Sequence, residues 1–158
     1  MAEQDNQPQP AGQPNIAVVA QYVKDLSFEN PGAPQSLRPR SAAPNINVAI
    51  NVQANPVADN QLEIELRLEA RAADKDSGEV LFASELVYAG IFQFNNIPPD
   101  QVRPLALVEC PRLLFPFARQ IIAEASRNGG FPQLLIEPVD FATLYRQQAA
   151  GERRPANN

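Results

Sequence analysis

The sequence of 158 residues contains no histidine and no tryptophan, and its only cysteine is Cys110. The absence of histidine excludes imidazole-based catalytic triads, histidine metal ligands and proton transfer by histidine. A single cysteine excludes an intrachain disulfide and leaves a structural zinc site without its usual ligands. Only Gly129 and Gly130 are adjacent among seven glycines, so a glycine-rich phosphate loop is also missing. We therefore expect no catalytic residue, no metal site and no cofactor.

Long hydrophobic runs are missing as well. No apolar stretch reaches the ~20 residues of a membrane span, and the first residues lack the pattern of a signal peptide. We therefore expect a cytoplasmic protein without membrane insertion. Acidic residues outnumber basic ones by 18 to 13, which disfavours nucleic-acid binding because that depends on Lys and Arg. The acidic excess serves either solubility or a patch for a basic partner.

Alternation of apolar and polar residues predicts four strands. They cover residues 15–30, 45–56, 61–74 and 79–94. In the first, Asp25 and Glu29 share the polar face. In the third, Glu63 and Glu65 are interpreted as part of a solvated face rather than as an acid–base pair. Short turns between the later strands predict an antiparallel meander that must bury one apolar face.

The remainder of the chain predicts two helices. Three prolines among residues 95–110 predict a long irregular crossover, which is either a connector or a functional segment. A long helix is expected from Cys110, with Pro111 in its first turn, to an end at Gly129. A shorter helix is expected over residues 139–150. The predicted fold is α+β: a four-stranded antiparallel sheet covered by a long helix and a shorter C-terminal helix. This domain covers residues 15–150, between disordered tails at 1–14 and 151–158.

The long helix carries apolar residues on two sides. We group Leu114, Phe117 and Ile121 into one stripe, and Leu113 and Ile122 into another. One stripe can cover the sheet. The second indicates subunit association, and the alternative is a helix sandwiched inside one domain.

Five segments together resemble signatures of the SecB family of protein-export chaperones. They are YVKDLSFENPGAP, GIFQF, CPRLLFPFAR, RNGGFPQL and PVDFATLY, in the family's order, and the resemblance covers residues 20–150. It implies a SecB-like fold and an ATP-independent cytosolic holdase. Such a protein keeps precursor proteins unfolded and translocation-competent, and delivers them to the SecA motor ATPase. The resemblance also implies a homotetramer, assembled as a dimer of dimers.

The resemblance and the apolar pattern suggest three sets of site residues. The implied SecA-binding set is Asp25, Glu29, Ala83 and Glu85, with Ala83 where the family often has a larger residue. The expected client-binding set is Ile91, Phe92, Phe94, Ile97, Phe141, Leu144 and Tyr145. The expected oligomer interface is Leu113, Leu114, Phe117, Ile121 and Ile122.

Alternative functions stay open at this point. The same fold could serve a SecB-like chaperone dedicated to one client, such as an antitoxin. A half-buried sheet under helices could also hold a small apolar ligand. An enzyme is disfavoured because no nucleophile, base and orienting group occur together.

Overall fold

The computed structural model describes residues 12–152, so the predicted tails at 1–14 and 151–158 lie largely outside the described residues. In chain order the elements are β1 (Asn15–Glu29), the short 3-10 helix η1 (Gln35–Leu37), β2 (Asn45–Ala58), β3 (Gln61–Ala73), β4 (Val80–Asn95), α1 (Pro99–Asn128) and α2 (Phe141–Glu152). The four predicted strands are confirmed to within two residues at each end, because the period-two pattern is a local signal.

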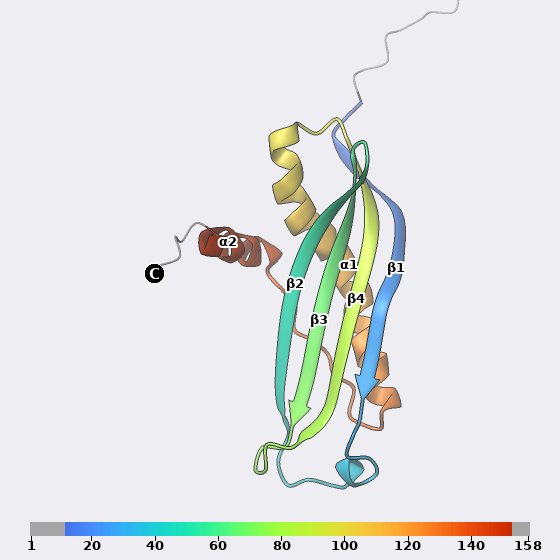
Figure 1. Ribbon diagram of the computed structural model, residues 1–158, viewed down its shortest axis with the longest axis vertical. Helices are drawn as coiled ribbons and strands as arrows, with labels where there is room; N and C mark the ends of the chain where they lie inside the picture. Colours follow the sequence, from blue (N-terminus) through green and yellow to red (C-terminus); the bar gives the residue numbers. More distant parts are fainter. Residues whose placement is uncertain (1–11, 153–158) are drawn as a thin grey trace, which may run out of the picture.

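The strands form one antiparallel sheet in the order β1-β4-β3-β2, so β1 and β2 are its edges. The helix α1 runs behind the sheet and covers its inner face (Figure 1). On that face Ile64, Leu66 and Leu68 of β3 are fully buried, and the alternating charged residues of β3 point to the outer face. The predicted α+β architecture is therefore confirmed.

The helix α1 begins at Pro99, well before the predicted start at Cys110. The prediction of a long irregular crossover was therefore wrong, and so was the placement of Pro111 in the first turn. Prolines usually break helices because they remove a backbone hydrogen bond. Here the first half of α1 buries Ala106, Leu107 and Cys110 in the hydrophobic core. This tertiary packing outweighs the unfavourable helix propensity of Pro104 and Pro111.

Strand β4 ends at Asn95, so Ile91, Phe92 and Phe94 are strand residues, in agreement with the predicted range 79–94. Phe92 and Phe94 are buried in the core. The close approach of α1 to β4 requires Gly90. A Cβ atom at Gly90 would lie 3.1 Å from a methyl group of Leu114 and 2.8 Å from the ring of Phe92.

Strict alternation along the predicted strand 79–94 would place Leu81 on the same face as Ala83 and Glu85, and this expectation was wrong. The pairing of β3 with β4 shifts register between Ala72 and Ala73, which leaves Leu81 without a cross-strand partner. Leu81 instead packs with Ala72 and Phe82 in a second, smaller hydrophobic cluster. A bulge of this kind interrupts the alternation of faces that the sequence pattern assumes.

The helix α1 ends at Asn128, with Gly129 as its C-cap, as predicted. A Cβ atom at Gly129 would lie 2.4 Å from the ring of Phe28 on β1. The side chain of Asn30 donates a hydrogen bond of 3.3 Å to the carbonyl oxygen of Gly129. Gly130 follows with a φ of +90°, a conformation that favours glycine. The two glycines thus allow the end of α1 to pack against the end of β1.

We predict that Gly129→Ala destabilises the protein by roughly 1–3 kcal/mol, because the new methyl group overlaps the Phe28 ring. The measurement is urea unfolding followed by circular dichroism. Gly151→Ala is the matched control, since a Cβ atom there meets no heavy atom within 4 Å. Equal unfolding midpoints for Gly129→Ala and the wild-type protein would contradict this packing.

Candidate protein-binding surfaces

The outer face of the sheet brings together the four residues that the sequence predicts to bind SecA. Across the β1–β4 pair, Glu29 lies opposite Ala83 and Asp25 lies opposite Val87. Glu85 lies opposite Ser27, between these two pairs. Directly opposed residues in an antiparallel pair share one face. Asp25, Glu29, Ala83 and Glu85 therefore form one continuous surface, which we call the acidic patch.

The acidic patch borders charged residues of β3 that sequence reasoning treated only as a solvated face. Glu69 is the cross-strand partner of Glu85, and Arg71 is the partner of Ala83. A hollow of about 350 Å³ lies here, lined by residues of β2, β3 and β4. The short side chains of Ala49 and Ala83 leave this space open. Knowledge of the strand order, which places β3 beside β4, would have pointed to Glu69.

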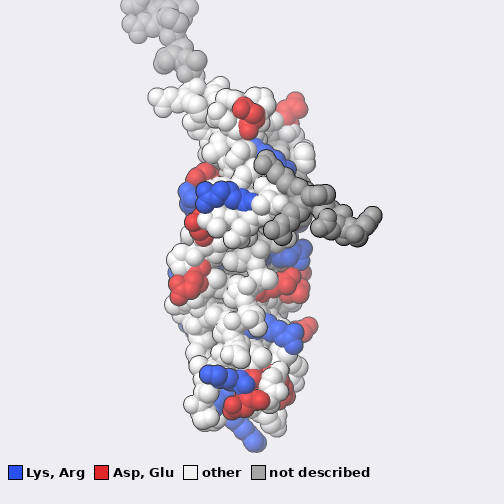
Figure 2. Space-filling model, turned by 90° about the vertical axis from the view of Figure 1, so that its left-hand side faces the viewer, with Lys and Arg blue, Asp and Glu red and all other residues white. Residues whose placement is uncertain are grey.

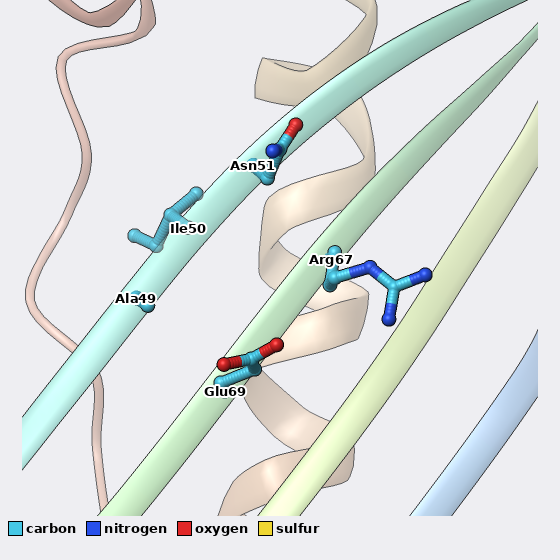
Figure 3. Close-up of a pocket in the computed structure, with 5 residues that line it drawn as sticks. All are labelled: Ala49, Ile50, Asn51, Arg67 and Glu69. Atoms are coloured by element: carbon cyan, nitrogen blue, oxygen red, sulfur yellow. The ribbon is translucent and has the colours of Figure 1, made fainter.

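A second hollow of about 200 Å³ lies between β2 and β3 (Figure 3). Arg67 and Glu69 rise from β3 on one side of it, and Ala49, Ile50 and Asn51 of β2 form the other side. None of the ion pairs within residues 12–152 involves Arg67, Glu69 or Glu85. The charges of this part of the outer face are therefore available to a partner.

A polar cluster lies farther along the same face and joins β1 to β3. The hydroxyl of Tyr22 donates a hydrogen bond to Glu63. The ammonium group of Lys24 lies 3.1 Å from Glu63 Oε1 and 2.5 Å from Glu65 Oε1. The fully buried Ala89 of β4 lies between these strands and leaves room for both long side chains. We call Tyr22, Lys24, Glu63 and Glu65 the Tyr–Lys clamp.

The clamp shifts the pKa values of its members in consistent directions. Burial and the hydrogen bond to Glu63 raise the pKa of Tyr22 to about 12. The hydrogen bond from Tyr22 is the main cause that lowers the pKa of Glu63. Hydrogen bonds to Glu65 and Glu63 raise the pKa of Lys24. Glu63 and Glu65 do lie on the outer face as interpreted, but their side chains are only 15% exposed beneath the lysine.

The helix α1 has two apolar sides, as predicted, but the predicted grouping of residues was wrong. Leu114 and Ile122 are both fully buried, whereas Leu113 and Phe117 are 47% and 52% exposed. Ile121 is partly buried. Eight residues, about two helical turns, separate Leu114 from Ile122, so both face the sheet, whereas Leu113 and Phe117, four residues apart, point away from the core.

The exposed side of α1 continues onto the free edge of the sheet. The rings of Phe117 and Tyr88 stack with their centroids 6.3 Å apart. Tyr88 is the cross-strand partner of Val23 on the edge strand β1. Four apolar residues of β1 are about half exposed, namely Val18, Val19, Val23 and Leu26. The chain thus presents apolar surface both on α1 and along β1.

Six of the seven predicted client-binding residues belong to one hydrophobic cluster, and Ile91 does not. Ile91 pairs with Glu63 and so lies on the outer face. Phe92, Phe94 and Phe141 are buried within the cluster. The partly buried members at its rim are Ile97, Leu144 and Tyr145.

Leu144 and Tyr145 lie on α2, which stands to one side of the sheet (Figure 1), and Ile97 lies in the loop between β4 and α1. The helix α2 packs on α1, with the rings of Phe141 and Phe115 edge to face at 6.0 Å. The segment between the two helices exposes 52% of Leu135. Figure 2 shows this side of the molecule, where uncharged surface runs between scattered charged groups.

Comparisons with known proteins agree with this architecture. Residues 9–152 match the family model described as preprotein translocase subunit SecB. The protein-export protein SecB of Xanthobacter autotrophicus is 52% identical over 155 residues, which cover 97% of this chain and 98% of that protein. The SecB of Mesorhizobium japonicum is 55% identical over 141 residues, which cover 89% of this chain and 83% of that protein.

A solved structure supports the fold alone. It is a SecB-like chaperone of Mycobacterium tuberculosis, in complex with a peptide from an antitoxin, and it superposes with a TM-score of 0.64 at 9% sequence identity. The match covers 78% of this chain and 90% of that one. Together the fold and the relatives define a protein-export chaperone rather than an enzyme. The chain belongs to the SecB family. No helix within residues 12–152 is long and apolar enough to cross a membrane.

We predict that the contribution of Glu63 to stability depends on pH. Because its pKa is lowered in the folded state, the stabilisation is present above its ordinary pKa of 4.5 and is lost as the pH falls through the folded-state value. Urea unfolding of the wild-type protein and Glu63→Gln should therefore differ at pH 7, and the difference should shrink as the pH is lowered below 4.5. Asp59→Asn, in the exposed β2–β3 turn, is the control. A difference that is independent of pH would contradict the clamp geometry.

Proposed function

We propose that this protein is an ATP-independent holdase of the cytoplasm, which keeps precursor proteins unfolded and delivers them to SecA. The observation that carries this proposal is that the acidic surface and the apolar surfaces lie on different sides of the sheet. The acidic patch lies on the outer face, while the apolar surfaces of α1, α2 and β1 lie on the other side or along its edge. Two such surfaces would allow one molecule to hold a client and dock on a motor at once.

The acidic patch suits a basic segment of SecA. Asp25, Glu29 and Glu85 are exposed and lie on adjacent strands. Complementary charge accelerates and orients docking. Ala83 supplies little apolar area by itself, but the adjoining hollow of about 350 Å³ offers space for a side chain of the partner.

Client binding is proposed for the rim of the main hydrophobic cluster. Of the predicted set, Ile97, Leu144 and Tyr145 are only partly buried, and Leu135 in the segment between α1 and α2 is also exposed. We propose that Phe92, Phe94 and Phe141 support this rim from within the core. Apolar surface beside irregular backbone binds extended chains by burial, without reading a particular sequence.

Self-association as a dimer of dimers is proposed from the two apolar surfaces. A tetramer built as a dimer of dimers needs two different interfaces. The exposed side of α1, with Leu113, Phe117 and Ile121, offers one surface. The free edge of β1 offers another. In this proposal Leu114 and Ile122 support the α1 interface from beneath, because they are buried against the sheet.

The test of the function is suppression of aggregation without ATP. A denatured, slow-folding secretory precursor is diluted into buffer with rising amounts of this protein, and light scattering is followed. We expect aggregation of the precursor to be suppressed, because the proposed rim binds any extended apolar chain. The suppression should saturate near one precursor chain per tetramer. The proposal would be overturned if the folded oligomer suppressed the aggregation of none of several unrelated precursors. In that event, an antitoxin-like single client or a small apolar ligand would be the next candidate.

The role of the acidic patch is tested separately with SecA. The triple variant Asp25→Asn, Glu29→Gln, Glu85→Gln should bind SecA at least about tenfold more weakly, because complementary charges across the interface are lost. Calorimetry or surface plasmon resonance at fixed salt measures this loss. Asp59→Asn, Asp100→Asn, Glu137→Gln changes the net charge equally at exposed sites outside the patch. Equal loss in both triple variants would show a general charge effect and reject the patch.

A further inference from the structure

Strand β1 carries an extra residue at Lys24. Val23 lies opposite Tyr88 and Asp25 lies opposite Val87, so adjacent residues of β4 pair with residues of β1 that are two apart. Lys24 is therefore the additional residue of a β-bulge. Such a bulge changes which residues of a strand face outward, because side chains otherwise alternate strictly.

The bulge is the reason that the polar cluster and the acidic patch share a face. Tyr22 lies opposite Ala89 on the outer face, before the bulge. Strict alternation from Tyr22 would turn Asp25 and Glu29 inward. With the extra residue, Asp25 lies on the outer face, and Leu26 and Phe28 point to the inner face. A bulge displaced beyond Asp25 would turn this carboxylate away from the patch.

We infer that Tyr22, Lys24, Glu63 and Glu65 act as positioning residues for the acidic patch, because they fix the bulge of β1 at Lys24. This inference rests on the proposed docking of SecA on the patch. The bulged residue itself makes the contacts, with 2.5 Å from its ammonium group to Glu65 and 3.1 Å to Glu63. The edge strand β1 is thereby connected to β3, two strands away, in addition to its ladder with β4.

The apolar anchors of β1 leave the exact place of the bulge to this clamp. After the bulge, Phe28 stacks on Phe82 with the ring centroids 5.4 Å apart. At the start of the strand, Ile16 packs against the main hydrophobic cluster. These anchors require two extra residues in β1, one at Val19 and one at Lys24, and neither anchor by itself fixes where the second one lies. The hydrogen bonds of Tyr22 and Lys24 to fixed positions on β3 supply that restraint.

The positioning role and a simple charge argument predict opposite results for the removal of Lys24. Lys24 is a cation next to Asp25 and repels a basic partner. If charge alone mattered, Lys24→Met would strengthen SecA binding. If the clamp positions the patch, the same substitution weakens binding although the protein becomes more acidic.

The experiment measures SecA binding to the full chain and four variants at one salt concentration. We expect about threefold weaker binding for Lys24→Met, the size of effect that loss of a surface ion-pair network can produce. Tyr22→Phe should weaken binding in the same direction without any change in charge. Lys24→Arg should bind like the wild-type protein, because a guanidinium group can make the same contacts. Lys75→Met, in the exposed β3–β4 turn, is the control for charge and should not weaken binding.

The register of β1 is measured independently by NMR in the same variants. Cross-strand NOEs that join Asp25 to Val87 and Leu26 to Leu86 report the bulge at Lys24. We expect them to weaken in Lys24→Met and Tyr22→Phe and to persist in Lys24→Arg. Unchanged NOEs, or SecA binding by Lys24→Met that equals or exceeds that of the wild-type protein, would overturn the inference. Failure of the wild-type protein to bind SecA would overturn the proposed docking, and the NOEs would then decide whether the clamp fixes the register.

Discussion

The burial of one face of the sheet against α1 is the interaction on which the rest of the structure depends. Ile64, Leu66 and Leu68 of β3 meet Leu114 and Ile122 of α1 in a single cluster, and all five are fully buried. A single helix cannot cover four long strands. It leaves the outer face free for charged residues and leaves apolar surface along β1. The exposed surfaces that we assign to partners are therefore consequences of how the core is built.

The sheet could be predicted from the sequence because a period of two is a local property of the chain. The third strand alternates without an error, and the structure confirms its faces. The start of α1 could not be predicted in this way. Pro104 and Pro111 are strong local signals against a helix, and they are outweighed by packing against strands that lie far away in the sequence. Leu81 was misplaced because a bulge changes the alternation without a local sign.

The candidate site residues also divide into those that a local sequence pattern places correctly and those whose position depends on the tertiary fold. Alternation in β1 correctly placed Asp25 and Glu29 on one polar face, and the family resemblance added Glu85 from β4. Glu69 was missed because its position beside Glu85 depends on the order of the strands. The expected client residues Phe92 and Phe94 lie on a strand that the alternation predicts, but both point to the inner face of the sheet and are buried there. Burial depends on the tertiary fold, which the local pattern did not reveal.

The free edge of β1 carries a hazard that its geometry reduces. A long, flat and apolar edge strand is a template for uncontrolled strand addition and for amyloid-like stacking. The pairing of β1 shifts register twice, between Val18 and Ala20 and again between Val23 and Asp25. These bulges divide the edge into short segments and increase its local twist, and a lysine stands at the second bulge. An arbitrary extended chain cannot follow such an edge along its whole length, so β1 can expose valines with a reduced risk of aggregation.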